Sequence, residues 1–228
     1  MPRTIAHLEE AGQDSSVRVI ILTGKDKIFS SGMNVQCFLN HQEPVNAAMF
    51  AESVPKMFET LIDFPKPIIV AVNGVAVGWG VTVCGLADIT LMAEGARLKC
   101  PFASLSNVPE AASTYSFPRL MGNQNALWTL LSNEWVDASR AREIGFAMEV
   151  INDDELLSEA MRKAQTLAQF PTVSLVATKK LMMDHHREPL KKANIDELKN
   201  FNELLNHPAC QEGVSAFKEK RQPDFSKF

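Results

Sequence analysis

Two short glycine turns constrain this chain more than any other feature of its sequence. Ser30-Ser31-Gly32-Met33 follows one predicted strand, and Gly78-Trp79-Gly80 follows another. Each turn leads from a β-rich run into a helical pattern, so each leaves backbone N–H groups unpaired near a helix start. Two such turns side by side would aim amide donors at one point, which suits an anion or a polarised carbonyl oxygen. The turns therefore predict a pocket built from backbone amides.

The order of the segments predicts an α/β fold with parallel strands. Residues 17–23 (VRVIILT) and 68–72 (IIVAV) are nearly continuous β-branched runs, which is typical of strands covered on both faces. Shorter strands are expected at residues 28–30, 88–92 and 97–100, with helices at 5–11, 34–40, 45–63 and 81–87. Beyond them the pattern is helical at residues 112–121, 123–132, 138–144, 153–169, 173–186, 189–205 and 208–221. We expect an α/β core over residues 1–150 and a helical region over residues 151–228, joined without a flexible linker.

The composition excludes several functional classes. The 228 residues are 46% hydrophobic and 22% charged, which is typical of a globular chain with one sizeable core. The net charge of -4 argues against a nucleic-acid partner. The four cysteines form no CxxC pair, which favours a reduced intracellular setting. The apolar stretch at residues 67–92 is interrupted by Asn73, glycines and Asp88, so no membrane span is predicted.

Most polar motifs have a simpler structural interpretation. Gly78-x-Gly80 begins like a dinucleotide fingerprint, but Val83 stands where the third glycine belongs. Asp184-His185-His186 has no second cluster to complete a metal site and is typical of a solvated helix face. We therefore predict no metal and no separate cofactor.

Glu110 is the strongest side-chain candidate for chemistry. Its neighbours in residues 107–113 are mostly apolar, so burial could raise its pKa into the range of a general base. It also precedes a predicted helix, whose dipole would lower the pKa of a carboxylate at its N-terminus. The residues alone leave both interpretations open.

Three segments together resemble the crotonase superfamily, also called the enoyl-CoA hydratase/isomerase family. They are residues 17–34 (VRVIILTGKDKIFSSGMN), 65–88 (PKPIIVAVNGVAVGWGVTVCGLAD) and 216–221 (AFKEKR), and the resemblance covers nearly the whole chain. It implies a crotonase-like spiral of ββα turns, a helical C-terminal trimerisation region and an acyl-CoA thioester as substrate. It also implies that the backbone N–H groups of Met33 and Trp79 form the oxyanion hole.

Departures from the family pattern bear on the reaction. Hydratases of the family use two glutamates, and the corresponding positions hold Thr82 and, after Pro101, Phe102. Residues 109–118 (PEAASTYSFP) instead resemble the PEGxSSYxFP-like segment of the peroxisomal type of Δ3,Δ2-enoyl-CoA isomerase. In those isomerases one glutamate, at the position of Glu110, moves a proton from C2 to C4. The resemblance thus implies an isomerase with Glu110 as its base.

The resemblance also implies binding residues and partners. The substrate contacts it implies are Ser31, Gly32, Gly78, Gly80 and Phe102, with Lys25 and Lys220 as contacts of the CoA phosphates or as ordinary surface lysines. Coenzyme A enters as part of the substrate. A homotrimer or hexamer would bury the apolar residues of the C-terminal helices, among them Leu175, Leu181, Leu204 and Phe217.

Other interpretations stay open at this stage. A hydratase with relocated residues or an acyl-CoA thioesterase would use the same enolate chemistry, and a catalytically silent acyl-CoA-binding scaffold would use none. The N-terminal β-hairpin and the Asn-Arg-Pro-like motif with which family members begin are not found in this sequence, which favours the scaffold, whereas the two glycine turns and Glu110 disfavour it. The expected location is the cytoplasm, and the terminal Ser226-Lys227-Phe228 resembles the peroxisomal Ser-Lys-Leu signal except at its last position.

Overall fold

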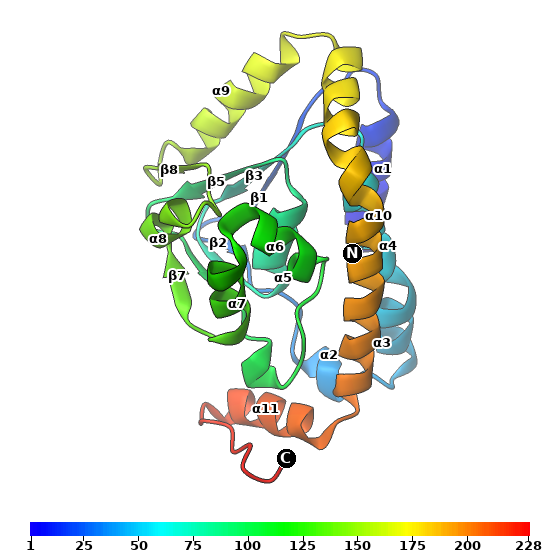
Figure 1. The fold of residues 1–228 in the computed structure, drawn as a ribbon, viewed down its shortest axis with the longest axis vertical. Helices are drawn as coiled ribbons and strands as arrows, with labels where there is room; N and C mark the ends of the chain where they lie inside the picture. The colour runs from blue at the N-terminus through cyan, green and yellow to red at the C-terminus, as the bar shows by residue number, and fades with distance from the viewer.

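Eight strands form two four-stranded sheets in the computed structural model, which describes residues 1–228 (Figure 1). The first sheet is parallel throughout and has the order β1 (Ile20–Thr23), β3 (Ile68–Val72), β5 (Ile89–Ala93), β8 (Glu149–Ile151). The second has the order β2 (Ile28–Ser30), β4 (Val75–Val77), β6 (Arg97–Lys99), β7 (Trp135–Asp137), and its last pair is antiparallel.

The two sheets are built by a repeating unit. Each of β1, β3 and β5 ends in a short turn that leads into β2, β4 or β6 of the second sheet. A helical segment then returns the chain to the next strand of the first sheet, α4 (Val54–Asp63) before β3 and α5 (Trp79–Thr82) before β5. The α/β fold with parallel strands is therefore confirmed.

The remaining helical segments surround the sheets. They are α1 (Pro2–Gln13), α2 (Gln36–Leu39), α3 (Pro44–Ala48), the π turn η1 (Met49–Ser53), the 3₁₀ turns η2 (Val83–Leu86) and η3 (Ala103–Leu105), α6 (Ser113–Met121), α7 (Asn123–Leu131), α8 (Ala138–Glu143), α9 (Leu156–Ala168), α10 (Thr172–Leu205) and α11 (Pro208–Glu219). α9 packs on the first sheet, while α10 packs against α4 and α6 (Figure 1). None of these helices combines the length and the apolar character needed to cross a bilayer.

The first strand differs from its prediction. Residues 17–23 were expected to be covered on both faces, but β1 begins at Ile20, its residues are half-buried and Thr23 is exposed. β1 lies at the edge of its sheet and pairs only with β3. β3 pairs on both sides, and all five of its residues are buried. The same β-branched run thus occurs at an edge and in the centre, because composition does not report a strand's place in the sheet.

The long helix α10 also corrects a prediction. Two helices were expected at residues 173–186 and 189–205, whereas one helix of 34 residues continues through Pro189. A proline in a helix interior removes one backbone donor and costs about 3 kcal/mol relative to alanine. Packing of α10 against α4 and α6 offsets that cost, since most helical stability in proteins comes from such contacts.

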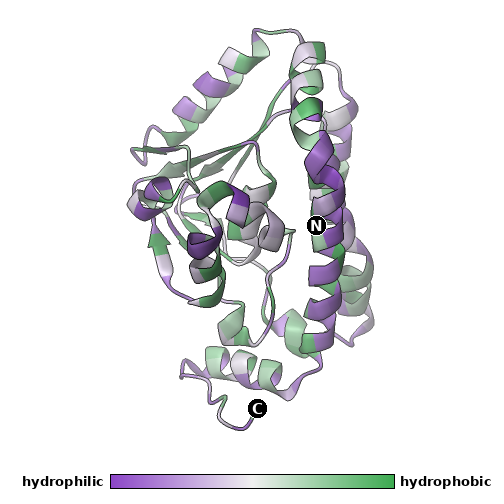
Figure 2. Cartoon of the chain, viewed as in Figure 1, coloured by the Kyte–Doolittle hydropathy of each residue, from purple (hydrophilic) through white to green (hydrophobic).

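One apolar core joins the strands to the C-terminal helices. It includes Ile69 of β3 and Leu91 of β5 together with Leu156, Leu190 and Phe201 from α9 and α10. Figure 2 shows hydrophobic colouring in the strands, whereas α10 is mostly hydrophilic in its middle and lower turns and partly hydrophobic in its upper turns. β8 crosses position 150, so the chain is continuous in structure where the two predicted regions meet. The division at that position stays a prediction.

The two glycine turns touch each other because β2 and β4 are neighbours in the second sheet. Gly32 has φ +76°, and a Cβ added there would lie 2.7 Å from the carbonyl oxygen of Val77. A Cβ on Gly80 would lie 2.8 Å from both the Cβ and the carbonyl oxygen of Ser30. Only glycine allows the turns to approach this closely.

We expect Gly80→Ala to destabilise the fold. Alanine favours the helix by about 1 kcal/mol, but overpacking against the Ser30 backbone costs about 1–3 kcal/mol. Urea titration measures the free energy of unfolding of the variant relative to that of the wild type. The matched control is Gly12→Ala in α1, where the added Cβ meets its nearest atom at 3.6 Å. The free energy of unfolding of this variant should differ from that of the wild type by less than about 1 kcal/mol. Equal urea midpoints for the two variants would contradict this prediction.

Candidate active site

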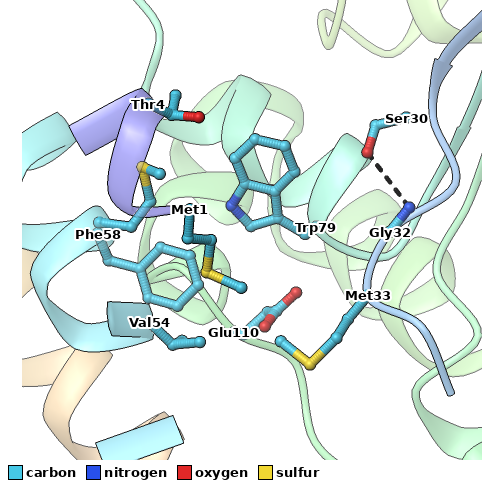
Figure 3. A pocket seen from close by; sticks show the side chains of 10 residues that line it. Met1, Thr4, Ser30, Gly32, Met33, Val54, Phe58, Trp79 and Glu110 are labelled. Atoms are coloured by element: carbon cyan, nitrogen blue, oxygen red, sulfur yellow. Dashed lines mark hydrogen bonds between the residues drawn. The ribbon is translucent and has the colours of Figure 1, made fainter. Parts of the chain in front are cut away.

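The two glycine turns border two cavities that share a wall. One cavity of about 240 Å³ lies between these turns and the helices α1 and α4, and Met1, Val54 and Phe58 form its apolar side (Figure 3). The second cavity has a volume of about 360 Å³ and adjoins the first. Four residues line both cavities, namely Gly32, Met33, Trp79 and Glu110. The structure therefore brings together residues from three separate segments of the chain.

The larger cavity is lined mainly by apolar and aromatic side chains. These are contributed by Val35, Phe38, Val77, Phe102, Leu105, Trp135, Phe201 and Phe217, among others. Its polar lining includes Asn107, whose side-chain Nδ2 is buried without a hydrogen-bond partner and is available as a donor. Such a mixture, largely apolar with a few placed polar groups, is typical of a small-molecule site.

The amides of Met33 and Trp79 have no partner within the protein. Met33 lies in neither a helix nor a strand, and Trp79 is the first residue of α5, where N–H groups lack intrahelical acceptors. The preceding amides are anchored, because Gly32 N donates to Ser30 Oγ at 3.2 Å and Gly78 N donates to the Lys99 carbonyl at 2.9 Å. The two turns are thus fixed while the next amide of each stays unpaired beside the cavities.

Glu110 points its carboxyl group into the space beside Met33 and Trp79 (Figure 3). The residue is 5% exposed and lies in the loop between η3 and α6. Burial, followed by the nearby charge of Glu197, raises the pKa of Glu110 to about 8. No hydrogen bond to the carboxylate opposes this shift. Of the two interpretations left open by the sequence, desolvation dominates at this position.

The N-terminus of α6 is occupied by a different carboxylate. Glu197, on α10, accepts hydrogen bonds from Ala112 N at 2.7 Å, Thr114 N at 2.8 Å and Thr114 Oγ1 at 2.5 Å. Burial raises the pKa of Glu197 to about 7, and these three hydrogen bonds act in the opposite direction. The helix dipole that could have lowered the pKa of Glu110 is therefore directed at Glu197 instead.

Glu197 was missed by the sequence analysis. Its signal is visible only once the helix is known to be continuous, because Leu190, Asn194, Glu197, Phe201 and Leu205 then form one buried face. A carboxylate on a buried helix face requires partners. Those partners lie about 85 residues away in the chain, so no local motif marks them.

The positions at which hydratases carry their glutamates have no acidic group. Thr82 is buried in α5, and its hydroxyl lies 3.4 Å from the Trp79 carbonyl oxygen and 3.5 Å from that of Gly78. Phe102 is 5% exposed and lines the larger cavity. Glu110 is consequently the only carboxylate that lines either cavity.

The predicted binding residues divide into two groups. Ser31, Gly32, Gly78 and Phe102 line the larger cavity, and Gly80 packs against Ser30 behind it. The two lysines that were predicted to contact CoA, Lys25 and Lys220, line neither cavity.

Lys25 is exposed in the turn between β1 and β2, and Lys220 is exposed at the C-terminal end of α11. Their contact with CoA phosphates stays a prediction. Lys99, which was not predicted, lines the larger cavity with its ammonium group 5.2 Å from the centre of the Trp135 ring.

Comparisons with known proteins agree with this geometry. The sequence model described as "Enoyl-CoA hydratase/isomerase" matches residues 3–227. A 2,3-dehydroadipyl-CoA hydratase of Escherichia coli (strain K12) is 31% identical over 221 residues, which cover 97% of this chain and 86% of that protein. Enoyl-CoA delta isomerase 2 of Homo sapiens is 32% identical over 197 residues, which cover 83% of this chain and 49% of that protein.

Solved structures share the fold as well. The crystal structure of an enoyl-CoA hydratase/isomerase from Pseudoalteromonas atlantica T6c matches with a TM-score of 0.90 at 29% identity, covering 98% of this chain and 88% of that one. The match extends over the core, the glycine turns and the C-terminal helices alike. The resemblance to crotonases is confirmed, and the chain belongs to the enoyl-CoA hydratase/isomerase family.

Proposed function

We propose that this protein is an isomerase that moves the double bond of a 3-enoyl-CoA to the 2 position. The observation that carries the proposal is that Glu110 is the only carboxylate lining the cavities beside the unpaired Met33 and Trp79 amides. Isomerisation needs a single base, because the proton removed is the proton returned. Hydration in this family uses two glutamates, and Thr82 and Phe102 hold their positions.

In the proposed reaction the thioester carbonyl oxygen accepts hydrogen bonds from the Met33 and Trp79 amides. The Glu110 carboxylate removes a proton from C2, and the electron pair of that C–H bond moves toward the carbonyl to form an enolate. Protonated Glu110 then delivers the same proton to C4. The thioester carbonyl re-forms from the enolate, the C2–C3 double bond is made, and the electron pair of the former C3–C4 double bond forms the new C4–H bond. A general base contributes about 10²–10⁴ in rate, and one oxyanion donor about 10²–10³.

The apolar lining supports this assignment over hydration. Phe102 lines the larger cavity at a position where the hydratases carry a glutamate, so this position offers no acidic group to hold and activate a water molecule. An enolate in a dry site is protected from side reactions, whereas a hydratase must hold a nucleophilic water. Similarity to the enoyl-CoA delta isomerases of rat, mouse and human also supports the proposal. Similarity to hydratases is equally high, so hydration is the alternative to be tested.

We expect the wild-type protein to convert a 3-enoyl-CoA into the conjugated 2-enoyl-CoA and to leave a 2-enoyl-CoA unhydrated. Glu110→Gln keeps the size of the side chain but removes the base, so kcat should fall by about 10²–10⁴ with acyl-CoA binding retained. The ultraviolet absorbance of the conjugated thioester follows both reactions. Glu203→Gln makes the same change at an exposed position of α10 and should leave the rate unaltered.

Four results would contradict the proposal. Loss of the 2-enoyl absorbance with the wild-type protein would indicate hydration, and unchanged isomerisation in Glu110→Gln would exclude Glu110 as the base. Release of free CoA thiol would indicate a thioesterase instead. Tight acyl-CoA binding without any turnover would indicate the scaffold.

The pH dependence follows from the raised pKa of Glu110. Only the ionised carboxylate can remove the C2 proton, so kcat/KM should rise about tenfold per pH unit at low pH and level off above about pH 8. The profile is measured from about pH 6 to about pH 9 with a substrate whose acyl chain does not titrate. A profile that is already flat at about pH 6 would show that the base has an ordinary carboxylate pKa.

We also propose that the protein forms a homotrimer or a hexamer that binds acyl-CoA. Leu181 and Phe217 are 74% and 61% exposed, while Leu175 and Leu204 are half-buried. Exposed apolar side chains of this size on two C-terminal helices favour contact with further copies of the chain. Sedimentation equilibrium should give three or six times the mass of one chain, and a mass of one chain would contradict this assembly.

A further inference from the structure

We propose that Glu197 is a positioning residue, which holds the turn that carries Glu110 and directs the Glu110 carboxylate into the cavity. The inference rests on the proposed role of Glu110 as the base. It is carried by the three hydrogen bonds that tie Ala112 and Thr114 to Glu197 on α10.

The turn after Glu110 adopts a conformation that its sequence does not favour. Ala111 has φ +59° and Ala112 has φ +55°, so two consecutive alanines occupy the left-handed region. Residues with a Cβ rarely adopt this region, and two in a row persist only when the surroundings impose it. Both alanines are fully buried, which fixes their place in the core but not the direction of their amides.

Glu197 supplies the side-chain interactions that hold the turn, beside one backbone hydrogen bond that Ser113 N donates to the Glu110 carbonyl oxygen at 3.2 Å. Glu197 Oε2 accepts from Ala112 N, and Glu197 Oε1 accepts from Thr114 N and Thr114 Oγ1. A relaxed turn would leave the Ala112 amide buried without a partner, because the position has no access to water. The carboxylate therefore links the strained turn to α10, whose packing against α6 is part of the core.

The position of these bonds in the chain relates them to catalysis. Ala112 lies only two residues beyond Glu110, so a rotation of the Ala112 peptide moves the Glu110 side chain. A displacement of about 1 Å at a catalytic group can reduce the rate about a hundredfold. Glu197 itself does not line either cavity, so it acts on the reaction only through Glu110.

The charge of Glu197 acts on Glu110 as well. Among the groups that face the Glu110 carboxyl, Glu197 from α10 is acidic and Cys100, after β6, carries a thiol held neutral by burial. Lys99 lines the same cavity, but its ammonium group is placed over the Trp135 ring. Neither glutamate has a basic partner, so the repulsion between the two carboxylates is not compensated.

Glu197→Gln separates a positioning role from that of an ordinary helix cap. Glutamine keeps the shape and one acceptor oxygen but removes the charge and the second acceptor. We expect kcat for isomerisation to fall about tenfold to a hundredfold with KM little changed. We also expect the rise of kcat/KM with pH, called the acid limb of the profile, to move to lower pH. Thr114→Val removes one hydrogen bond that lowers the pKa of Glu197, so Glu197 stays protonated to higher pH in this variant. It should reduce kcat severalfold and move the acid limb of kcat/KM in the same direction as Glu197→Gln, by a smaller amount. Glu203→Gln is the matched control on α10.

A role in stability alone predicts a different result. Glu197→Gln would then unfold at a lower temperature while kcat and the acid limb at a permissive temperature stayed as in the wild type, which would overturn the proposal. If Glu197→Gln does not fold, the Thr114→Val variant still decides, since an unchanged kcat in that variant would also overturn it.

A second measurement keeps this inference distinct from the proposed function. A ¹³C NMR titration of the Glu110 carboxyl, assigned by comparison with Glu110→Gln, reports its pKa without any turnover. We expect a lower Glu110 pKa in Glu197→Gln than in the wild type. Absence of isomerase activity in the wild-type protein would refute the proposed function alone, whereas an identical Glu110 pKa in both proteins would refute the coupling between the two carboxylates.

Discussion

The close contact between the two glycine turns is the constraint on which the rest of the site depends. Pairing of β2 with β4 places the turns next to each other, and the absence of side chains at Gly32 and Gly80 allows the backbones to meet. The unpaired amides of Met33 and Trp79 are positioned by this contact. Their directions are fixed by the sheet, so in the proposed reaction the two donors need no reorganisation when the thioester oxygen binds.

The cavities beside these amides are lined largely by apolar side chains, and Glu110 is the one carboxylate among the lining residues. Burial raises the pKa of Glu110 to about 8, so between its ordinary pKa of 4.5 and that value the folded state binds a proton that the unfolded state does not. The stability contributed by this group therefore falls as the pH rises through that window, while the ionised fraction of the Glu110 carboxyl increases. In the proposed reaction, activity and stability therefore have opposite pH dependences at Glu110.

The parts of the structure that the sequence predicted are those with local causes. The strand at residues 68–72 and the turns at Gly32 and Gly80 follow from β-branched runs and from glycines, whose effects lie within a few residues. The exposed edge position of β1, the passage of α10 through Pro189 and the three-residue strands β4, β7 and β8 depend on neighbours far away in the chain. Glu197 belongs to the second kind, because its role is visible only where α10 meets α6.

The fold by itself does not select between the reactions of this family. A hydratase and an isomerase are similar to this chain at 31% and 32% identity, so overall likeness favours neither. The difference lies in how many acidic groups reach the cavity and how much water can enter it. With the Thr82 hydroxyl near the carbonyl groups of its own helix and Phe102 lining the larger cavity, Glu110 is the one carboxylate available for the proton transfer that we propose. A single base beside two fixed amides is sufficient for a double-bond shift, and the addition of water would require a further group to activate it.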